Sequence, residues 1–290
     1  MRPWTCHANR LAHALIVAML ARKTAAAEPS TDKSRFEKGL EKRTLSYWDQ
    51  GKPPRFYVSG RTEAGLYTKE QLAIGYGQPY WFSVSAEAFG ISTFSFGGAY
   101  AGVRGTLPFL DLRLGTRYSY SYKRSYLPPK EHYVADDVNN VDSGPNAHYQ
   151  SLEAELTGII PAFDGFFFPV ITVYHIYGIP DGVFVFDESL RGVVDPPWIM
   201  GFRLGYVKNF GRNDFIKLGV LTETVVLPGR SPIFRMGPAG AITITNHIDL
   251  QGTLSVVLAS PDSLGLFDGA FGVLGFVYRW ATGDEHPAFP

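Results

Sequence analysis

Apolar and polar residues alternate along most of the chain from Arg55 onward, and a period of two is typical of β-strands whose two faces meet different surroundings. The longest alternating segment is 110–123, LDLRLGTRYSYSYK. Leucine, threonine and tyrosine occupy one face, and charged residues, serine and glycine occupy the other. Such a segment is longer than the average globular strand of about five or six residues, whereas a membrane-crossing strand needs about nine to eleven. The pattern therefore favours strands that cross a membrane.

Ten further segments alternate in the same way or carry apolar runs between turn residues. They are 56–66, the two halves of 81–107, 150–157, 163–177, 198–208, 215–223, 232–244, 248–258 and 266–281. Residues 67–79 fit a short strand or a turn equally well. Because bacterial single-chain membrane barrels have even strand numbers, we expect about twelve strands, with ten as the second choice. The two long connections, 125–147 and 179–197, are expected to form the outward-facing surface.

Alternation alone does not say which face meets water. The apolar face points inward in a soluble β-sandwich or calyx and outward in a membrane barrel. Strand length favours the membrane, as does a polar face rich in glycine and in both charge signs. Several apolar faces also end in aromatic residues, which suits an interfacial girdle. These residues are Tyr118, Tyr120, Tyr122, Tyr278 and Trp280.

Over about residues 55–282 the chain therefore resembles Gram-negative outer-membrane β-barrel proteins. The resemblance is architectural and identifies no functional family. It implies an all-β fold, namely an antiparallel up-and-down transmembrane β-barrel. It also implies contact with outer-membrane lipids and with the barrel-assembly machinery during insertion, and it leaves the oligomeric state open.

The N-terminal residues have the order of a secretory signal peptide. Arg2 and Arg10 precede an apolar run, and three alanines precede Glu28. An apolar run of this length is too short to span a bilayer as a helix. We therefore expect a signal peptide at 1–27, a polar N-terminal arm at 28–54 and the β-barrel domain at 55–290. The expected location is the cell outer membrane.

Composition excludes several classes of protein. Lysine plus arginine and aspartate plus glutamate both number 27, so the chain lacks the basic excess of a nucleic-acid-binding protein. Loss of the leader would leave 23 basic residues against 27 acidic ones. The one cysteine, Cys6, lies in that leader, which excludes a disulfide framework and a thiolate zinc site. We expect no cofactor and no nucleic-acid partner.

The polar faces carry a nearly balanced set of charges, which becomes the lining of the lumen if the barrel spans a membrane. Buried charges need partners. The set could be a network of structural salt bridges that join opposite walls of a narrow barrel, or a selectivity lining for a small polar solute in a wider one. Its members are Arg61, Glu63, Glu87, Arg104, Asp111, Arg113, Arg117, Lys123, Glu153, Glu155, Arg203, Lys217, Glu223, Arg235, Asp249 and Arg279.

The chain offers weak candidates for catalysis or metal binding. His148 and Ser151 are the nearest pair for acyl transfer, but their odd spacing places them on opposite faces of a strand. The acidic residues 136–142 do not have the spacing of a twelve-residue calcium loop. We therefore expect a small passive channel or a structural envelope protein. The alternatives are a barrel-type lipid acyl hydrolase or transferase, and a soluble secreted β-calyx that binds an apolar ligand.

Overall fold

The computed structural model describes residues 53–80, 82–139, 144–163, 165–210, 216–245 and 247–283. The expected signal peptide at 1–27 lies outside the described residues, as does nearly all of the expected arm at 28–54. The same holds for part of the acidic loop and for the last seven residues. The first strand begins at Arg55.

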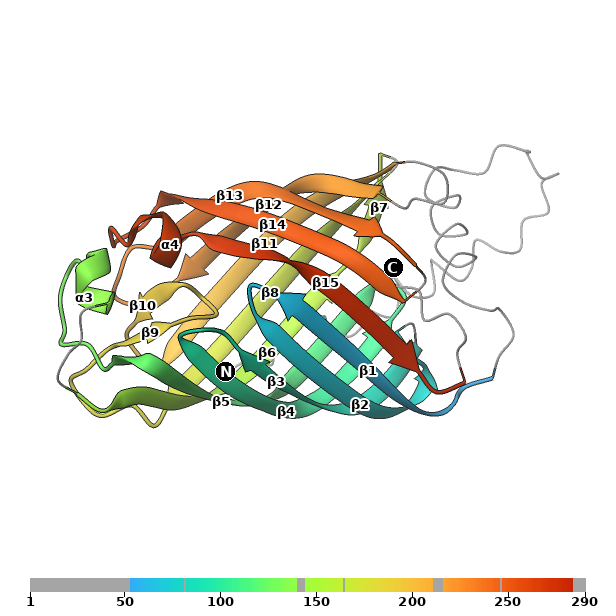
Figure 1. Cartoon of the computed structure of the whole chain (residues 1–290), viewed down its shortest axis with the longest axis horizontal. Helices are drawn as coiled ribbons and strands as arrows, with labels where there is room; N and C mark the ends of the chain where they lie inside the picture. Colours follow the sequence, from blue (N-terminus) through green and yellow to red (C-terminus); the bar gives the residue numbers. More distant parts are fainter. Residues whose placement is uncertain are drawn as a thin grey trace, which may run out of the picture. The chain divides into compact units, whose positions relative to one another are not determined.

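Twelve long strands within the described residues form one closed antiparallel sheet (Figure 1). Each long strand pairs with the next one along the chain, and β1 closes the ring by pairing with β15, with Gly60 opposite Trp280. The strands are β1 (Arg55–Gly65), β2 (Thr68–Gln78), β3 (Phe82–Ser92), β4 (Phe96–Leu107), β5 (Leu110–Ser125), β6 (Asn146–Gly158), β8 (Gly165–Tyr177), β11 (Trp198–Phe210), β12 (Ile216–Val226), β13 (Ile233–Thr243), β14 (Ile248–Ala259) and β15 (Phe271–Ala281).

Shorter elements lie in the connections between the long strands. β7 (Ile160–Ala162) pairs with the start of β8, and β9 (Val185–Asp187) pairs with β10 (Gly192–Val194). Two one-turn helices follow β5 and β14, namely α3 (Ala135–Asn139) and α4 (Gly265–Gly269). No helix among the described residues is long and apolar enough to cross a membrane.

The two ends of the barrel differ in the length of their connections. At one end β1 begins, β15 ends and the 108–109 turn joins β4 to β5. We call this the turn end. The opposite end, which we call the loop end, carries the connections 126–145, 178–197 and 260–270. Short periplasmic turns and longer extracellular loops are typical of transmembrane barrels.

The side chains settle which face points outward. Leu112 and Leu114 of β5 are 41% and 43% exposed, whereas Arg117 and Ser119 on the other face are 5% and 0% exposed. The same division holds along the other long strands, where leucine, valine, phenylalanine and tyrosine dominate the exposed hydrophobic residues. An apolar exterior around a polar interior is the arrangement of a transmembrane barrel and the reverse of a soluble calyx.

The ambiguous residues 67–79 form a full strand, β2, in which Leu72 and Ile74 point outward and Ala73 points inward. This strand completes the even number, and the expectation of twelve strands is confirmed. Its alternation is harder to recognise in the sequence because small and polar residues such as Gly75 and Gln71 occupy its inner face.

One predicted lumen residue, Lys123, is exposed instead. The pairing of β5 with β6 shifts register between Tyr120 and Ser125. A bulge adds a residue to one strand and so reverses the faces beyond it. Lys123 therefore points away from the lumen, and Arg124 is buried in its place. The alternation of 110–123 placed Lys123 on the lumen face, because nothing in the sequence of this segment marks the bulge.

The outward face of β5 provides a test of the membrane assignment. Leu114→Arg should lower the free energy of unfolding by about 2–4 kcal/mol if Leu114 lies near the bilayer midplane. Phe94→Arg is the matched control, because Phe94 is 86% exposed in the turn that connects β3 to β4 rather than midway along a strand. Urea unfolding in lipid vesicles measures both variants. Equal stability of the two variants would contradict the assignment.

Candidate functional site

The connection between β8 and β11 folds inward rather than outward. All six residues of β9 and β10 are buried, and Figure 1 shows this hairpin inside the ring of strands at the loop end. The expectation that 179–197 forms outward-facing surface is therefore wrong. Its sequence explains the difference, because the apolar residues of VFVF and GVV would be costly to leave in water.

The hairpin is packed on both of its faces. On one face Val185, Leu190 and Val194 contact side chains of the barrel wall, and we call this group the wall cluster. On the other face Phe186 and Val193 contact the connections 126–145 and 260–270 at the loop end, which we call the outer loops. We call this second group the outer cluster. The wall-cluster partners are Ala147, Tyr149, Tyr174, Ile176, Ile199, Val225, Leu227 and Ile233. The outer-cluster partners are Leu127, Tyr133, Val138 and Leu264.

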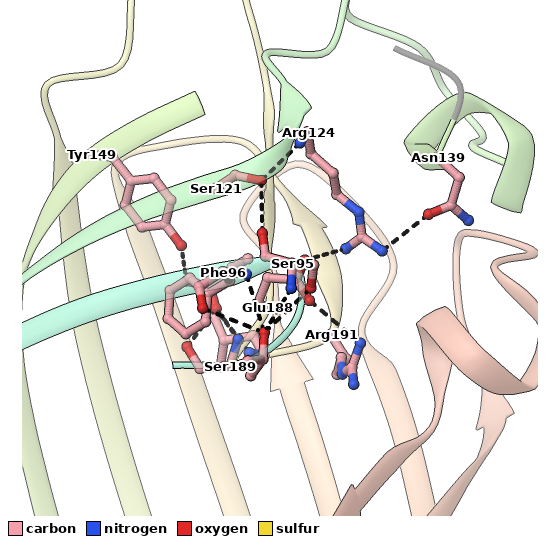
Figure 2. Close-up of polar contacts among 12 residues, drawn as sticks. Ser95, Phe96, Ser121, Arg124, Asn139, Tyr149, Glu188, Ser189 and Arg191 are labelled. Carbon is pink, nitrogen blue, oxygen red and sulfur yellow. Dashed lines mark hydrogen bonds and ion pairs between the residues drawn. The ribbon is translucent and has the colours of Figure 1, made fainter. Parts of the chain in front are cut away.

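Polar contacts show that the hairpin reaches across the lumen. The Ser95 side chain, between β3 and β4, hydrogen-bonds Glu188 (Figure 2). On the far side the Arg235 guanidinium of β13 donates a 2.6 Å hydrogen bond to the Arg191 carbonyl oxygen. Because β4 and β13 are six positions apart in a ring of twelve strands, these contacts lie on opposite walls. The hairpin therefore crosses the lumen at the loop end of the barrel.

Asp187 fixes the tight turn of the hairpin. Its carboxylate accepts hydrogen bonds from the backbone N–H groups of Ser189 and Leu190, both at 2.8 Å. It also accepts 2.6 Å and 2.7 Å hydrogen bonds from the hydroxyls of Ser189 and Tyr149. Arg117 of β5 lies 3.8 Å away. The turn is thus held to two strands of the wall.

Arg124 links the wall, the hairpin and an outer loop (Figure 2). Its guanidinium donates a 2.6 Å hydrogen bond to the Glu188 carboxylate and a 3.1 Å hydrogen bond to the Asn139 side-chain oxygen of α3. Burial raises the pKa of Glu188 and outweighs the opposing effect of Arg124 and Arg191. A second buried ion pair, Arg230–Asp262 at 2.5 Å, fastens the outer loops to each other.

The predicted lumen charges form ion pairs along the walls. Within the described part of the chain, each pair joins residues on one strand or on adjacent strands. The pairs that the structure shows therefore run along the wall of the barrel, as structural salt bridges between neighbouring residues. The pairs are Arg61–Glu63 (2.9 Å), Arg104–Glu87 (3.7 Å), Arg104–Asp111 (2.8 Å), Arg113–Glu155 (3.2 Å), Arg117–Glu153 (2.7 Å), Arg203–Glu223 (2.6 Å), Arg235–Glu223 (2.8 Å) and Arg279–Asp249 (2.5 Å).

Strand register explains why the charges pair along the wall. Arg113 is directly opposite Glu155, and Glu223 is directly opposite both Arg203 and Arg235. Opposite residues on one face have Cβ atoms about 4.5–5.5 Å apart, so neighbouring strands supply the nearest countercharge. Lys217, the remaining member of the predicted set beside Lys123, is partly buried on β12.

Alternation placed Arg117 and Arg235 in the lumen but missed four other residues that hold the hairpin. Asp187, Glu188 and Arg230 lie in the connections between long strands, where the alternation gave no assignment, and Arg124 lies beyond the bulge. One signal was present, since two short apolar runs flank DESLRG, which is the pattern of a hairpin.

The proposed acyl-transfer pair does not form. His148 is exposed on the outer face of β6, whereas Ser151 is fully buried on the inner face. His148 Nδ1 lies 3.2 Å from the Asn146 carbonyl oxygen. No cluster of three histidine, cysteine, aspartate or glutamate side chains suitable for a metal occurs among the residues that the structure describes.

Comparison with known proteins finds similar architecture without close relatives. No family model matches the chain, and no curated protein matches it. The solved structures that it resembles include the KdgM porin in complex with disordered oligogalacturonate, at 9% identity and a TM-score of 0.37 over 77% of this chain and 98% of that chain. The NanC porin is 11% identical, with a TM-score of 0.36 over 78% of this chain and 97% of that chain.

Arg117 provides a test of how tightly the hairpin is fastened. Arg117→Met would leave Glu153 and Asp187 buried without their guanidinium, so the free energy of unfolding should fall by about 3–5 kcal/mol. Glu153→Gln in the same chain should restore part of the loss. Urea unfolding provides the measurement. Lys130→Met, which breaks the exposed Lys130–Asp137 pair, is the control and should be nearly neutral. Equal stability of the Arg117 and Lys130 variants would contradict the role of Arg117.

Proposed function

We propose that this protein is an outer-membrane solute passage whose outer mouth is closed by the β9–β10 hairpin and opens when the hairpin is displaced. The observation that carries the proposal is the hairpin itself, which is buried inside the barrel and contacts opposite walls. The signal peptide expected at 1–27 and the apolar exterior support an outer-membrane location. Outer-membrane lipids and the assembly machinery are the partners we propose.

The side chains in the lumen between the hairpin and the turn end favour a passage over a barrel whose interior is filled by side chains. The ion pairs lie along the walls, and several side chains in them keep partial contact with solvent, such as Arg104 at 29% and Arg203 at 28%. Twelve strands enclose modest space beyond their side chains. The space that the wall leaves open is closed at the outer mouth by a separate segment, which could move without unfolding the barrel.

The hairpin also has the local backbone features of a movable segment. Gly178 and Gly182 precede it with φ values of +80° and +74°, and glycine adopts this backbone conformation without steric cost. The conformational change of a hinge is absorbed by a few such loop residues. Displacement of the hairpin would therefore require rearrangement of a short segment before Val185.

Conductance distinguishes a closed passage from a structural barrel. The unmodified protein should carry little steady current in a planar bilayer. Asp187→Asn with Glu188→Gln removes the carboxylates that Arg117 and Arg124 hold, at a cost to the closed state of about 3 kcal/mol. The open fraction should then rise on the order of a hundredfold, because about 1.4 kcal/mol corresponds to a factor of ten. Lys130→Met is the control and should leave the current unchanged.

A tether tests whether the hairpin itself is the element that moves. A β-carbon at Gly192 would lie 2.8 Å from Ile233 Cδ1 on β13. Gly192→Cys with Ile233→Cys, in a chain that also carries Cys6→Ser, should form a disulfide between hairpin and wall. In the Asp187→Asn and Glu188→Gln background, oxidation should abolish the current and reduction should restore it. A current that persists in the oxidised protein, or a steady current from the unmodified protein, would refute closure by the hairpin.

A further inference from the structure

A cavity of about 220 Å³ lies in the lumen towards the turn end, away from the hairpin. It is formed by β1 to β6 together with the neighbouring turns. This volume is below the roughly 300–1,000 Å³ of pockets that hold drug-sized ligands. A ligand that fills it would therefore be smaller than such molecules.

Seven of the thirteen uncharged residues that line the cavity carry a hydroxyl group. They include Ser59 of β1 and Ser83 and Ser85 of β3, which β2 separates, together with Thr106 and Tyr57. A hydroxyl both donates and accepts hydrogen bonds. The wall therefore offers closely spaced partners to a solute that also presents groups of both kinds.

The charged side chains of the cavity are already paired. Arg104 lies 2.8 Å from Asp111 and 3.7 Å from Glu87. Arg61 pairs with Glu63 at 2.9 Å. An ionic ligand would have to compete with these contacts and pay the cost of losing its own hydration. The compensated charges favour a ligand without net charge.

One acceptor in the wall lacks a partner. Glu87 is 4% exposed, and its Oε2 accepts a 2.8 Å hydrogen bond from the Gln71 side chain. Its other oxygen, Oε1, is buried and has no hydrogen-bond partner among the described residues. A buried acceptor without a donor is costly. A hydroxyl donor from a ligand in the cavity would remove that cost.

We propose that this cavity binds a neutral polyhydroxylated solute of about the size of a monosaccharide or a sugar alcohol. One ligand hydroxyl donates to Glu87 Oε1, and others exchange hydrogen bonds with the serine side chains of β1 and β3. That this ligand is also the solute transported by the protein rests on the proposed function, because a bound ligand can cross the barrel only if the passage opens.

Calorimetric titration of the intact, detergent-solubilised protein tests the ligand class. Sorbitol should bind with a saturable heat, and gluconate and glucosamine, which are similar in size but charged, should bind at least tenfold more weakly. Equal or tighter binding of either charged probe would overturn the proposal. Absence of saturable sorbitol binding would overturn it as well.

Two variants test the position of the site. Glu87→Gln should weaken sorbitol binding at least tenfold, because an amide replaces the carboxylate that accepts the hydroxyl. Ser83→Ala with Ser85→Ala should weaken it similarly and serves if Glu87→Gln fails to fold. Ser255→Ala is the control, since Ser255 is a fully buried serine of β14 that does not line this cavity. Sorbitol binding that is unchanged in the folded cavity variants would refute the site.

The two proposals fail separately. Sorbitol binding that depends on Glu87, together with hairpin variants that stay closed, would refute the passage and leave the site intact. Conductance in the hairpin variants without sorbitol binding would refute the site and leave the passage intact.

Discussion

The fold depends on the need to satisfy every backbone hydrogen bond without water. In hydrocarbon an unpaired N–H or C=O group costs several kcal/mol, so a sheet can cross a membrane only if it has no free edge. Pairing of β1 with β15 removes that edge here. In a closed sheet, alternate side chains of every strand point into the lumen. Because the apolar side chains face the membrane, the polar face of each strand lines the lumen.

The charges placed inside by this alternation are neutralised by their nearest neighbours. A guanidinium and a carboxylate directly opposite each other on adjacent strands, such as Arg203 and Glu223 at 2.6 Å, need no reach across the lumen. Most of these charges are therefore compensated within the wall, whereas Arg124 is paired with Glu188 of the hairpin. The ion pairs between barrel strands lie along the wall, and a segment that is not part of the wall, the β9–β10 hairpin, packs inside the barrel at the loop end.

Sequence reasoning succeeded where structure is set by local periodicity. The alternation of 110–123 predicted both the strand and its outward face, and the even-number rule recovered β2. It failed at Lys123 because a bulge is a property of the pairing of two strands. It also failed for 179–197, because the inward fold of this loop depends on wall residues distant in sequence, including Ile233 and Tyr149. The partners of Asp187 and Glu188 could not be predicted for the same reason.

The two faces of the hairpin indicate what its displacement would involve. Because Phe186 and Val193 pack against the outer loops, the hairpin cannot leave the wall cluster without moving those loops or exposing the outer cluster to water. Arg124 couples the same elements through Glu188 and Asn139. The apolar contacts of the two clusters resist partial separation of the hairpin from its neighbours. The hydrogen bonds of the buried Arg124 guanidinium to Glu188 and Asn139 would be lost together when the hairpin moves. The closed mouth is therefore expected to behave as one cooperative unit that is distinct from the barrel wall beneath it.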